Sequence, residues 1–145
     1  MSKETIAIDI DDVLAHENDA IRKFINESYG LALTPDDYKI EAPYWGYWEH
    51  VWGVGEEEGR ERFQAYLDSG VKAELHVGEG ALETLAHLGK KYELAVVTSR
   101  NDQLVDVTHQ WLERHFPAVF RSIEFVHVWS GDNKASKAII CKKIG

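Results

Sequence analysis

Two apolar patterns alternate along the chain and divide it into short strands and amphipathic helices. Apolar residues at every second position predict a buried strand over residues 5–10. Two further apolar runs predict strands over residues 92–97 and 123–129. Apolar residues at helical spacing predict four helices, over residues 16–29, 80–88, 102–115 and 134–144. This alternation predicts an α/β fold in which helices flank a parallel sheet with right-handed crossovers.

Residues 31–70 interrupt the alternation and contain no convincing strand. Thr34 followed by Pro35 is typical of a helix start, and residues 56–67 predict a further helix. We therefore expect one domain over residues 1–145, with a small helical insert at about residues 31–70 and a core formed by residues 1–30 and 71–145.

The insert contains a dense aromatic segment. Five large aromatic residues fall within nine positions: Tyr44, Trp45, Tyr47, Trp48 and Trp52. One interpretation is that most of them form the core of the insert. The other is that one or two, with Trp45 and Trp48 as candidates, stack on a nucleobase, as aromatic side chains do in many nucleic-acid sites.

Composition narrows the class of protein. The 145 residues carry 16 basic and 25 acidic side chains, a net charge of −9. This balance argues against a surface that binds duplex nucleic acid, which needs clustered Lys and Arg. A single cysteine and the lack of an apolar run of roughly 20 residues predict a cytoplasmic protein that does not span a membrane. The oligomeric state cannot be inferred from the sequence.

Three carboxylates, Asp9, Asp11 and Asp12, gather at the end of the first predicted strand. Open α/β sheets bind ligands beyond the carboxyl ends of their strands. Like charges at this spacing repel unless a cation or proton compensates them. We therefore expect a site for a divalent metal ion and a phosphate, centred on Asp9 and Asp11, although an isolated Asp-x-Asp pair also occurs in solvated loops.

Polar residues also follow the second strand. Thr98, Ser99 and Arg100 come directly after the apolar run, and Ser99 and Arg100 are candidates for substrate binding. Arg100 is able either to reach a substrate phosphate or to pair with a carboxylate. Lys134 and Lys137 lie at the start of the last predicted helix.

In this order, these residues resemble the motifs of the haloacid dehalogenase (HAD) superfamily, and the first motif is most similar to that of the 5'(3')-deoxyribonucleotidase branch. Asp9, Asp11 and Val13 match the first motif, Thr98 the second, and Lys137 or Lys134 the third. In that branch the lysine commonly lies about eight residues before the glycine that ends its helix, which favours Lys137. The resemblance spans residues 5–145 and implies a HAD-like Rossmannoid core with a helical cap.

The resemblance also implies a chemistry. Asp9 would attack phosphorus and form an aspartyl-phosphate, and Asp11 would act as acid and then as base. Mg²⁺ would be held by the Asp9 carboxylate and the Asp11 carbonyl, Thr98 would bind a phosphoryl oxygen, and Lys137 would neutralise charge. The expected activity is hydrolysis of a small phosphorylated substrate, most similar to a 5'-nucleotide or deoxynucleotide.

The chain departs from the family pattern in two places. Asp12 stands where a glycine is often found. The fourth motif, a strand that ends in acidic metal ligands, is missing before Gly145, so we expect either that the chain is truncated at its C-terminus or that another segment supplies the missing ligand. The alternative function is a catalytically weak HAD-like binding or regulatory domain that lacks the last metal ligand.

Overall fold

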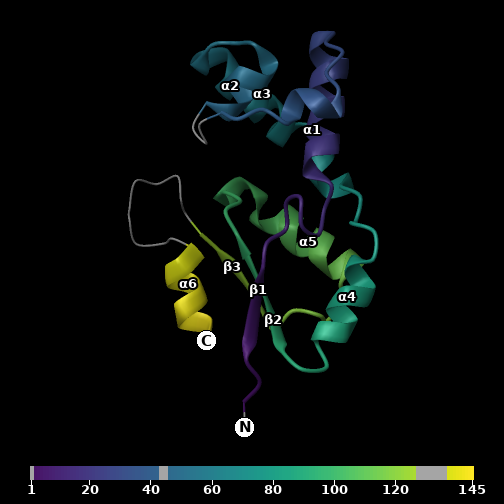
Figure 1. Ribbon diagram of the computed structural model, residues 1–145, viewed down its shortest axis with the longest axis vertical. Coiled ribbons are helices and arrows are strands. Elements are labelled where there is room, and N and C mark those ends of the chain that lie inside the picture. Colours follow the sequence, from purple (N-terminus) through teal and green to yellow (C-terminus); the bar gives the residue numbers. More distant parts are fainter. Residues whose placement is uncertain (1, 43–45, 127–136) are drawn as a thin grey trace. The chain divides into compact units, whose positions relative to one another are not determined.

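The computed structural model describes residues 2–42, 46–126 and 137–145. The chain forms two compact units, one made of Met1–His16 and Leu75–Gly145 and the other of Glu17–Glu74 (Figure 1). The first contains the sheet and the second is helical. None of the helices in the described residues has the length and apolar character needed to cross a membrane.

A parallel sheet organises the first unit. Strands β1 (Thr5–Ile8), β2 (Glu93–Thr98) and β3 (Ser122–Phe125) pair in that order, and both pairings are parallel. This confirms the predicted α/β class. Strand β2 lies between the other two, and five of its six residues are buried.

The outer strands differ from the prediction. Within the described residues β1 pairs only with β2, so Ile6 and Ile8 are half-buried and not buried as expected. Strand β1 also ends two residues early, because the Ile10 carbonyl is turned into a loop where it accepts hydrogen bonds from three later N–H groups. Strand β3 ends at Phe125, and the expected continuation over residues 127–129 lies outside the described residues.

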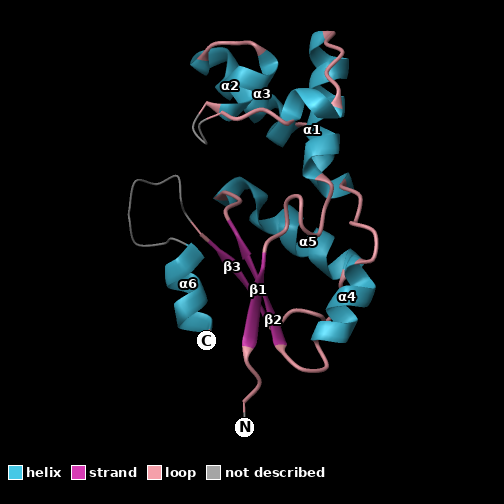
Figure 2. Ribbon diagram, viewed as in Figure 1, coloured by secondary structure: helices cyan, strands magenta, loops and turns pink. Residues whose placement is uncertain are grey.

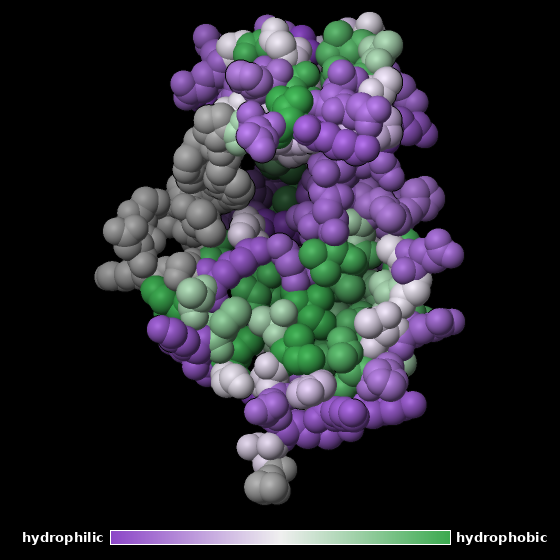
Figure 3. Space-filling model, viewed as in Figure 1, coloured by the Kyte–Doolittle hydropathy of each residue, from purple (hydrophilic) through white to green (hydrophobic). Residues whose placement is uncertain are grey.

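Helices α4 (Ala81–Leu88), α5 (Val105–His115) and α6 (Lys137–Ile144) complete this unit. Both α4 and α6 pack against β2. In the view of Figure 2, α4 and α5 lie to one side of the strands and α6 to the other. The interior side chains Ile10, Val96, Trp111, Phe116 and Val126 are almost wholly buried, and Figure 3 shows further apolar residues gathered on the visible face of this unit.

The helical unit is larger than the predicted insert. Helix α1 (Glu17–Tyr29) packs against α3 (Glu56–Asp68), where the rings of Phe24 and Tyr66 lie 5.5 Å apart. The unit therefore begins at residue 17, whereas the insert was expected to begin at about residue 31. The sequence pattern located α1 well, but it did not indicate which unit its apolar face would join.

The described part of the aromatic segment forms a helix that the sequence pattern did not predict. Helix α2 (Tyr47–Trp52) is bounded by Gly46 and Gly53, whose φ angles of 91° and 66° are left-handed and therefore favour glycine. The ring of Trp48 stacks on Trp52 at 5.2 Å and on Phe63 at 6.2 Å.

A second contact joins the aromatic helix to the turn before it. The predicted start at Thr34 and Pro35 is confirmed as a capped 3₁₀ turn (Pro35–Tyr38). The Trp52 indole N–H donates to the Tyr38 hydroxyl at 3.3 Å, and burial raises the pKa of that phenol above its usual 10.0. Among the described residues of the segment, Trp52 is buried in the unit and Trp48 packs against it.

A buried ion pair joins the first residue of the helical unit to a residue near its last. The Lys72 Nζ lies 2.6 Å from Glu17 Oε1, and the two side chains are only 4% and 8% exposed. We expect Lys72→Met to lower the free energy of unfolding by about 3–5 kcal/mol, because it removes the buried cation that pairs with the Glu17 carboxylate. The Glu17→Gln/Lys72→Met double variant should recover much of this loss. Urea unfolding of the variants measures both effects; additive losses would contradict the expectation.

Candidate active site

The loop after β1 presents two of the predicted catalytic carboxylates. The carbonyl of Ile10 accepts hydrogen bonds from the N–H groups of Val13, Leu14 and Ala15, at 2.8–3.1 Å, which folds the loop into a compact turn. Asp12 adopts a left-handed φ of 58°, a conformation that explains why glycine suits this position. The Asp9 Oδ1 atom accepts the Ile10 N–H at 2.8 Å, which fixes the orientation of that carboxylate.

Lys137 forms an ion pair with Asp9. Its Nζ lies 2.5 Å from Asp9 Oδ2, although the two residues are 128 positions apart. Each side chain is 39% exposed, so the pair remains accessible to a solute. Lys134, the other sequence candidate, lies outside the described residues. Lys137 thus contacts Asp9, and its catalytic role stays a prediction.

Arg100 pairs with Asp11. Its Nη2 lies 2.7 Å from Asp11 Oδ1 and its Nε lies 3.1 Å from Asp11 Oδ2, so both carboxylate oxygens are bound. Its Nη1 donates to the hydroxyl of Thr108 on α5 at 3.0 Å. Of the two alternatives that the sequence left open for Arg100, the structure shows the pairing with a carboxylate.

Thr108 was missed by the sequence analysis. It is wholly buried, and it lies four residues after Leu104 and three before Trp111, on the apolar face of α5. A hydroxyl on that face needs a hydrogen-bond partner, and this was the signal available in the sequence.

Thr98 and Ser99 lie at the carboxyl end of β2, next to the loop that follows β1 in the parallel register. The Thr98 side chain is wholly buried, and its Oγ1 accepts the Arg100 N–H at 3.3 Å. Ser99 is half-buried. Their roles in binding a phosphoryl group stay predictions.

The two tryptophans singled out for substrate binding have different outcomes. Trp45 lies outside the described residues, and Trp48 belongs to the aromatic core of the helical unit. A stacking role for either tryptophan stays a prediction.

The donors around Asp9 and Asp11 fit a magnesium ion. The Asp9 carboxylate and the Asp11 backbone carbonyl are hard oxygen ligands. Mg²⁺ commonly uses one or two carboxylates and keeps water and substrate phosphate in its remaining positions. The described part of the chain contains no cluster of three or more His, Cys, Asp or Glu side chains able to hold a metal. The fit therefore rests on Asp9 and the backbone of the adjacent loop.

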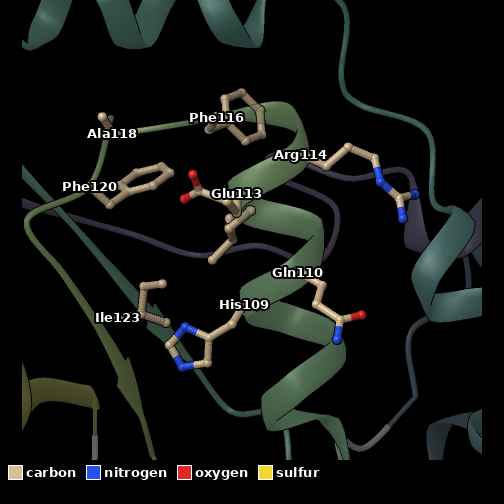
Figure 4. Close-up of a pocket in the computed structure, with 9 residues that line it drawn as sticks. His109, Gln110, Glu113, Arg114, Phe116, Ala118, Phe120 and Ile123 are labelled. Atoms are coloured by element: carbon tan, nitrogen blue, oxygen red, sulfur yellow. The ribbon is translucent and has the colours of Figure 1, made fainter.

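A separate pocket lies on α5, away from these carboxylates. It has a volume of about 670 Å³ and is lined from α5, the loop after it and the start of β3 (Figure 4). His109, Glu113 and Phe120 are among the side chains that surround it. None of the predicted site residues lines it, so it adds nothing to the catalytic arrangement.

Solved structures show the same fold at low sequence identity. YfnB of Bacillus subtilis, assigned as a HAD hydrolase and bound to magnesium, is 17% identical with a TM-score of 0.54; the match covers 85% of this chain and 65% of that one. The haloacid dehalogenase-like protein SP0104 of Streptococcus pneumoniae is 14% identical with a TM-score of 0.58, covering 83% and 60%. A predicted phosphatase of Clostridium acetobutylicum is 18% identical with a TM-score of 0.57, covering 85% and 61%. The chain thus spans less than two thirds of the length of each of these proteins.

Sequence comparison identifies the family. A search of curated proteins found no significant match. The family described as 5' nucleotidase, deoxy (pyrimidine), cytosolic type C, or NT5C, matches residues 3–130, which include the first two motifs and most of both units. The match covers most of the chain, and the parallel sheet agrees with the HAD-like fold of the solved structures. The chain belongs to the NT5C family of HAD-like 5'-nucleotidases.

Proposed function

We propose that the protein hydrolyses phosphomonoesters through an aspartyl-phosphate on Asp9, with a 5'-nucleotide or 5'-deoxynucleotide as substrate. The observation that carries the proposal is the arrangement after β1, where Lys137 contacts Asp9 and Arg100 contacts Asp11. Each carboxylate thus has its own cationic partner, which holds the two proposed reacting groups in place beside the end of β1.

The proposed reaction has two steps. The Asp9 carboxylate attacks phosphorus, the bond to the ester oxygen breaks, and that oxygen takes a proton from Asp11. Water then attacks the phosphoryl group on Asp9 while Asp11 removes its proton, which releases inorganic phosphate and restores both carboxyl groups. The ammonium of Lys137 offsets the negative charge on Asp9 and on the phosphoryl oxygens as they approach.

The Asp9 carboxylate and the Asp11 backbone carbonyl would hold Mg²⁺, which when bound supplies positive charge beside the transferring phosphoryl group. Two observations support this cofactor: the oxygen donors after β1 and the magnesium bound by YfnB, which shares the fold. The Thr98 hydroxyl and Ser99 are proposed to bind phosphoryl oxygens.

The family supports the choice of substrate and compartment. Its description specifies 5' nucleotidase, deoxy (pyrimidine), and cytosolic. We therefore propose a cytoplasmic enzyme and a pyrimidine deoxynucleotide as the first substrate to examine.

The experiment is a comparison of deoxyuridine 5'-monophosphate, its 3'-phosphate isomer and 4-nitrophenyl phosphate, each with magnesium and with a chelator. The proposal predicts release of phosphate that requires magnesium and a higher kcat/KM for the 5'-nucleotide than for the aryl ester. Lack of hydrolysis of all three substrates in the presence of magnesium would contradict it.

Base stacking by the aromatic segment gives a further expected result. If Trp48 contacts the nucleobase, Trp48→Ala raises KM for deoxyuridine 5'-monophosphate by about tenfold, the loss of roughly 1–3 kcal/mol of stacking. KM for 4-nitrophenyl phosphate should then stay within about twofold. Because Trp48 also packs against Trp52 and Phe63, Trp48→Phe serves as the milder variant, and thermal melting checks that both variants are folded. Equal changes in KM for both substrates would rule out base stacking.

A further inference from the structure

The guanidinium of Arg100 is fixed on every side by the sheet-containing unit. All three of its nitrogens donate hydrogen bonds, two of them to Asp11 and the third to Thr108. Its side chain is only 2% exposed, whereas that of Asp11 is 28% exposed. Arg100 therefore lies behind Asp11, while part of the carboxylate remains open to a solute.

The contact needs an arginine. A planar guanidinium binds both oxygens of a carboxylate through two parallel N–H bonds, and this fixes the plane of the carboxylate as well as its position. An ionised carboxylate offers about four lone-pair sites, and the bidentate contact uses two of them. A lysine would supply charge without fixing the plane of the carboxylate.

Thr108 fixes the arginine in turn. Its hydroxyl is wholly buried and accepts from Nη1, so the guanidinium is held from α5 as well as from the loop after β1. Hydrogen bonds thus run from the buried Thr108 through Arg100 to the partly exposed Asp11. Asp11 is the carboxylate that the proposed function assigns to acid–base chemistry.

We infer that Arg100 is a positioning residue that acts through Asp11, and that it does not bind the substrate phosphate. This inference rests on the proposed function of Asp11. It replaces the expectation of a substrate contact, because the guanidinium is buried and each of its nitrogens already has an acceptor. The role of Arg100 is to hold the Asp11 carboxylate where it meets the leaving oxygen of the ester.

A leaving-group comparison distinguishes these roles. An alkyl ester such as a nucleotide needs a proton on its leaving oxygen, whereas 4-nitrophenolate leaves readily without one. We expect Arg100→Lys to lower kcat/KM for deoxyuridine 5'-monophosphate by about 30- to 100-fold, the scale that misplacement of a catalytic group produces. For 4-nitrophenyl phosphate the loss should be less than about threefold. Removal of a phosphate contact would lower kcat/KM for both substrates alike.

Two further variants test the connection. Thr108→Val keeps the shape of the side chain and removes the hydroxyl, so it should show the same selective loss at a smaller size, about threefold to tenfold. Arg100→Lys made in an Asp11→Asn background should cause no further loss with the nucleotide, because the group on which Arg100 acts is already gone.

Arg121→Lys is the matched control. Arg121 pairs with Glu93 near the other end of β2, so its replacement should leave both rates unchanged. Thermal melting checks the fold of each variant.

The outcomes separate this inference from the proposed function. Selective loss with the nucleotide in Arg100→Lys and Thr108→Val, absent from the Asp11→Asn background, supports the positioning role. Equal loss with both substrates, or an undiminished loss in the Asp11→Asn background, overturns that role and leaves the proposed function standing, because the wild type remains active. A folded wild-type chain inactive with both substrates and magnesium would overturn the proposed function and the role of Arg100 with it.

Discussion

Replacing Asp9 with Asn is expected to lower kcat for phosphomonoester hydrolysis by at least about a thousandfold. The amide cannot attack phosphorus as a carboxylate does, and loss of a covalent nucleophile commonly costs this much or more. The change also removes the negative charge that faces Lys137 at 2.5 Å. The fold should survive, because Asn keeps the shape of the side chain and Asp9 is partly exposed. Steady-state hydrolysis and a thermal melt measure the two effects.

The matched control for Asp9→Asn is Asp12→Asn. Asp12 lies in the same loop and its side chain is exposed, and asparagine tolerates its left-handed backbone as aspartate does. We expect kcat to stay within about threefold of the wild type in this variant. Comparable losses in the two variants would show that the loop tolerates no change, and retained activity in Asp9→Asn would exclude Asp9 as the nucleophile.

Replacing Lys137 with Met is expected to lower kcat/KM by about 100- to 1000-fold. The ammonium contacts Asp9 Oδ2 and would meet the phosphoryl oxygens as charge develops on them, and removal of one such electrostatic contact commonly has an effect of this size. Methionine keeps most of the length and the apolar stem of lysine. Arg in place of Lys137 should restore part of the rate, because it returns the charge with a different shape.

Lys142→Met provides the control on the same helix. Lys142 is exposed on α6, five residues after Lys137, and makes no ion pair among the described residues. Its replacement should leave kcat/KM unchanged within about twofold. Equal rates in the Lys137 and Lys142 variants would contradict the role of Lys137. They would direct attention to Lys134, which has the same charge near the start of this helix in the sequence.

The strand pattern was sufficient to predict which residues lie together at one edge of the sheet, whereas their catalytic roles stay predictions. The apolar runs of β1 and β2 end in polar residues, and parallel pairing brings these ends to one edge of the sheet. The family's spacing between lysine and glycine favoured Lys137, which contacts Asp9 although the two residues are 128 positions apart.

Other features depend on tertiary contacts that no local pattern contains. The apolar face of α1 was clear, but its packing against α3 was not, so the helical unit begins earlier than expected. Helix α2 was missed because its six residues, three of them large aromatics, are too few to show helical periodicity, and its bounds depend on two left-handed glycines. The partner of Arg100 was undetermined for the same reason, since Asp11 is 89 residues away.

The central claim is that Asp9 carries the phosphoryl group during turnover. The most direct measurement is rapid acid quenching of the enzyme with a substrate labelled at its phosphate, followed by digestion and mass spectrometry. We predict a transient phosphoryl group on the peptide that contains Asp9, stable in acid, released by hydroxylamine and absent from Asp9→Asn. Active turnover without any labelled peptide at quench times within the first turnover, or a label on another residue, would contradict the claim.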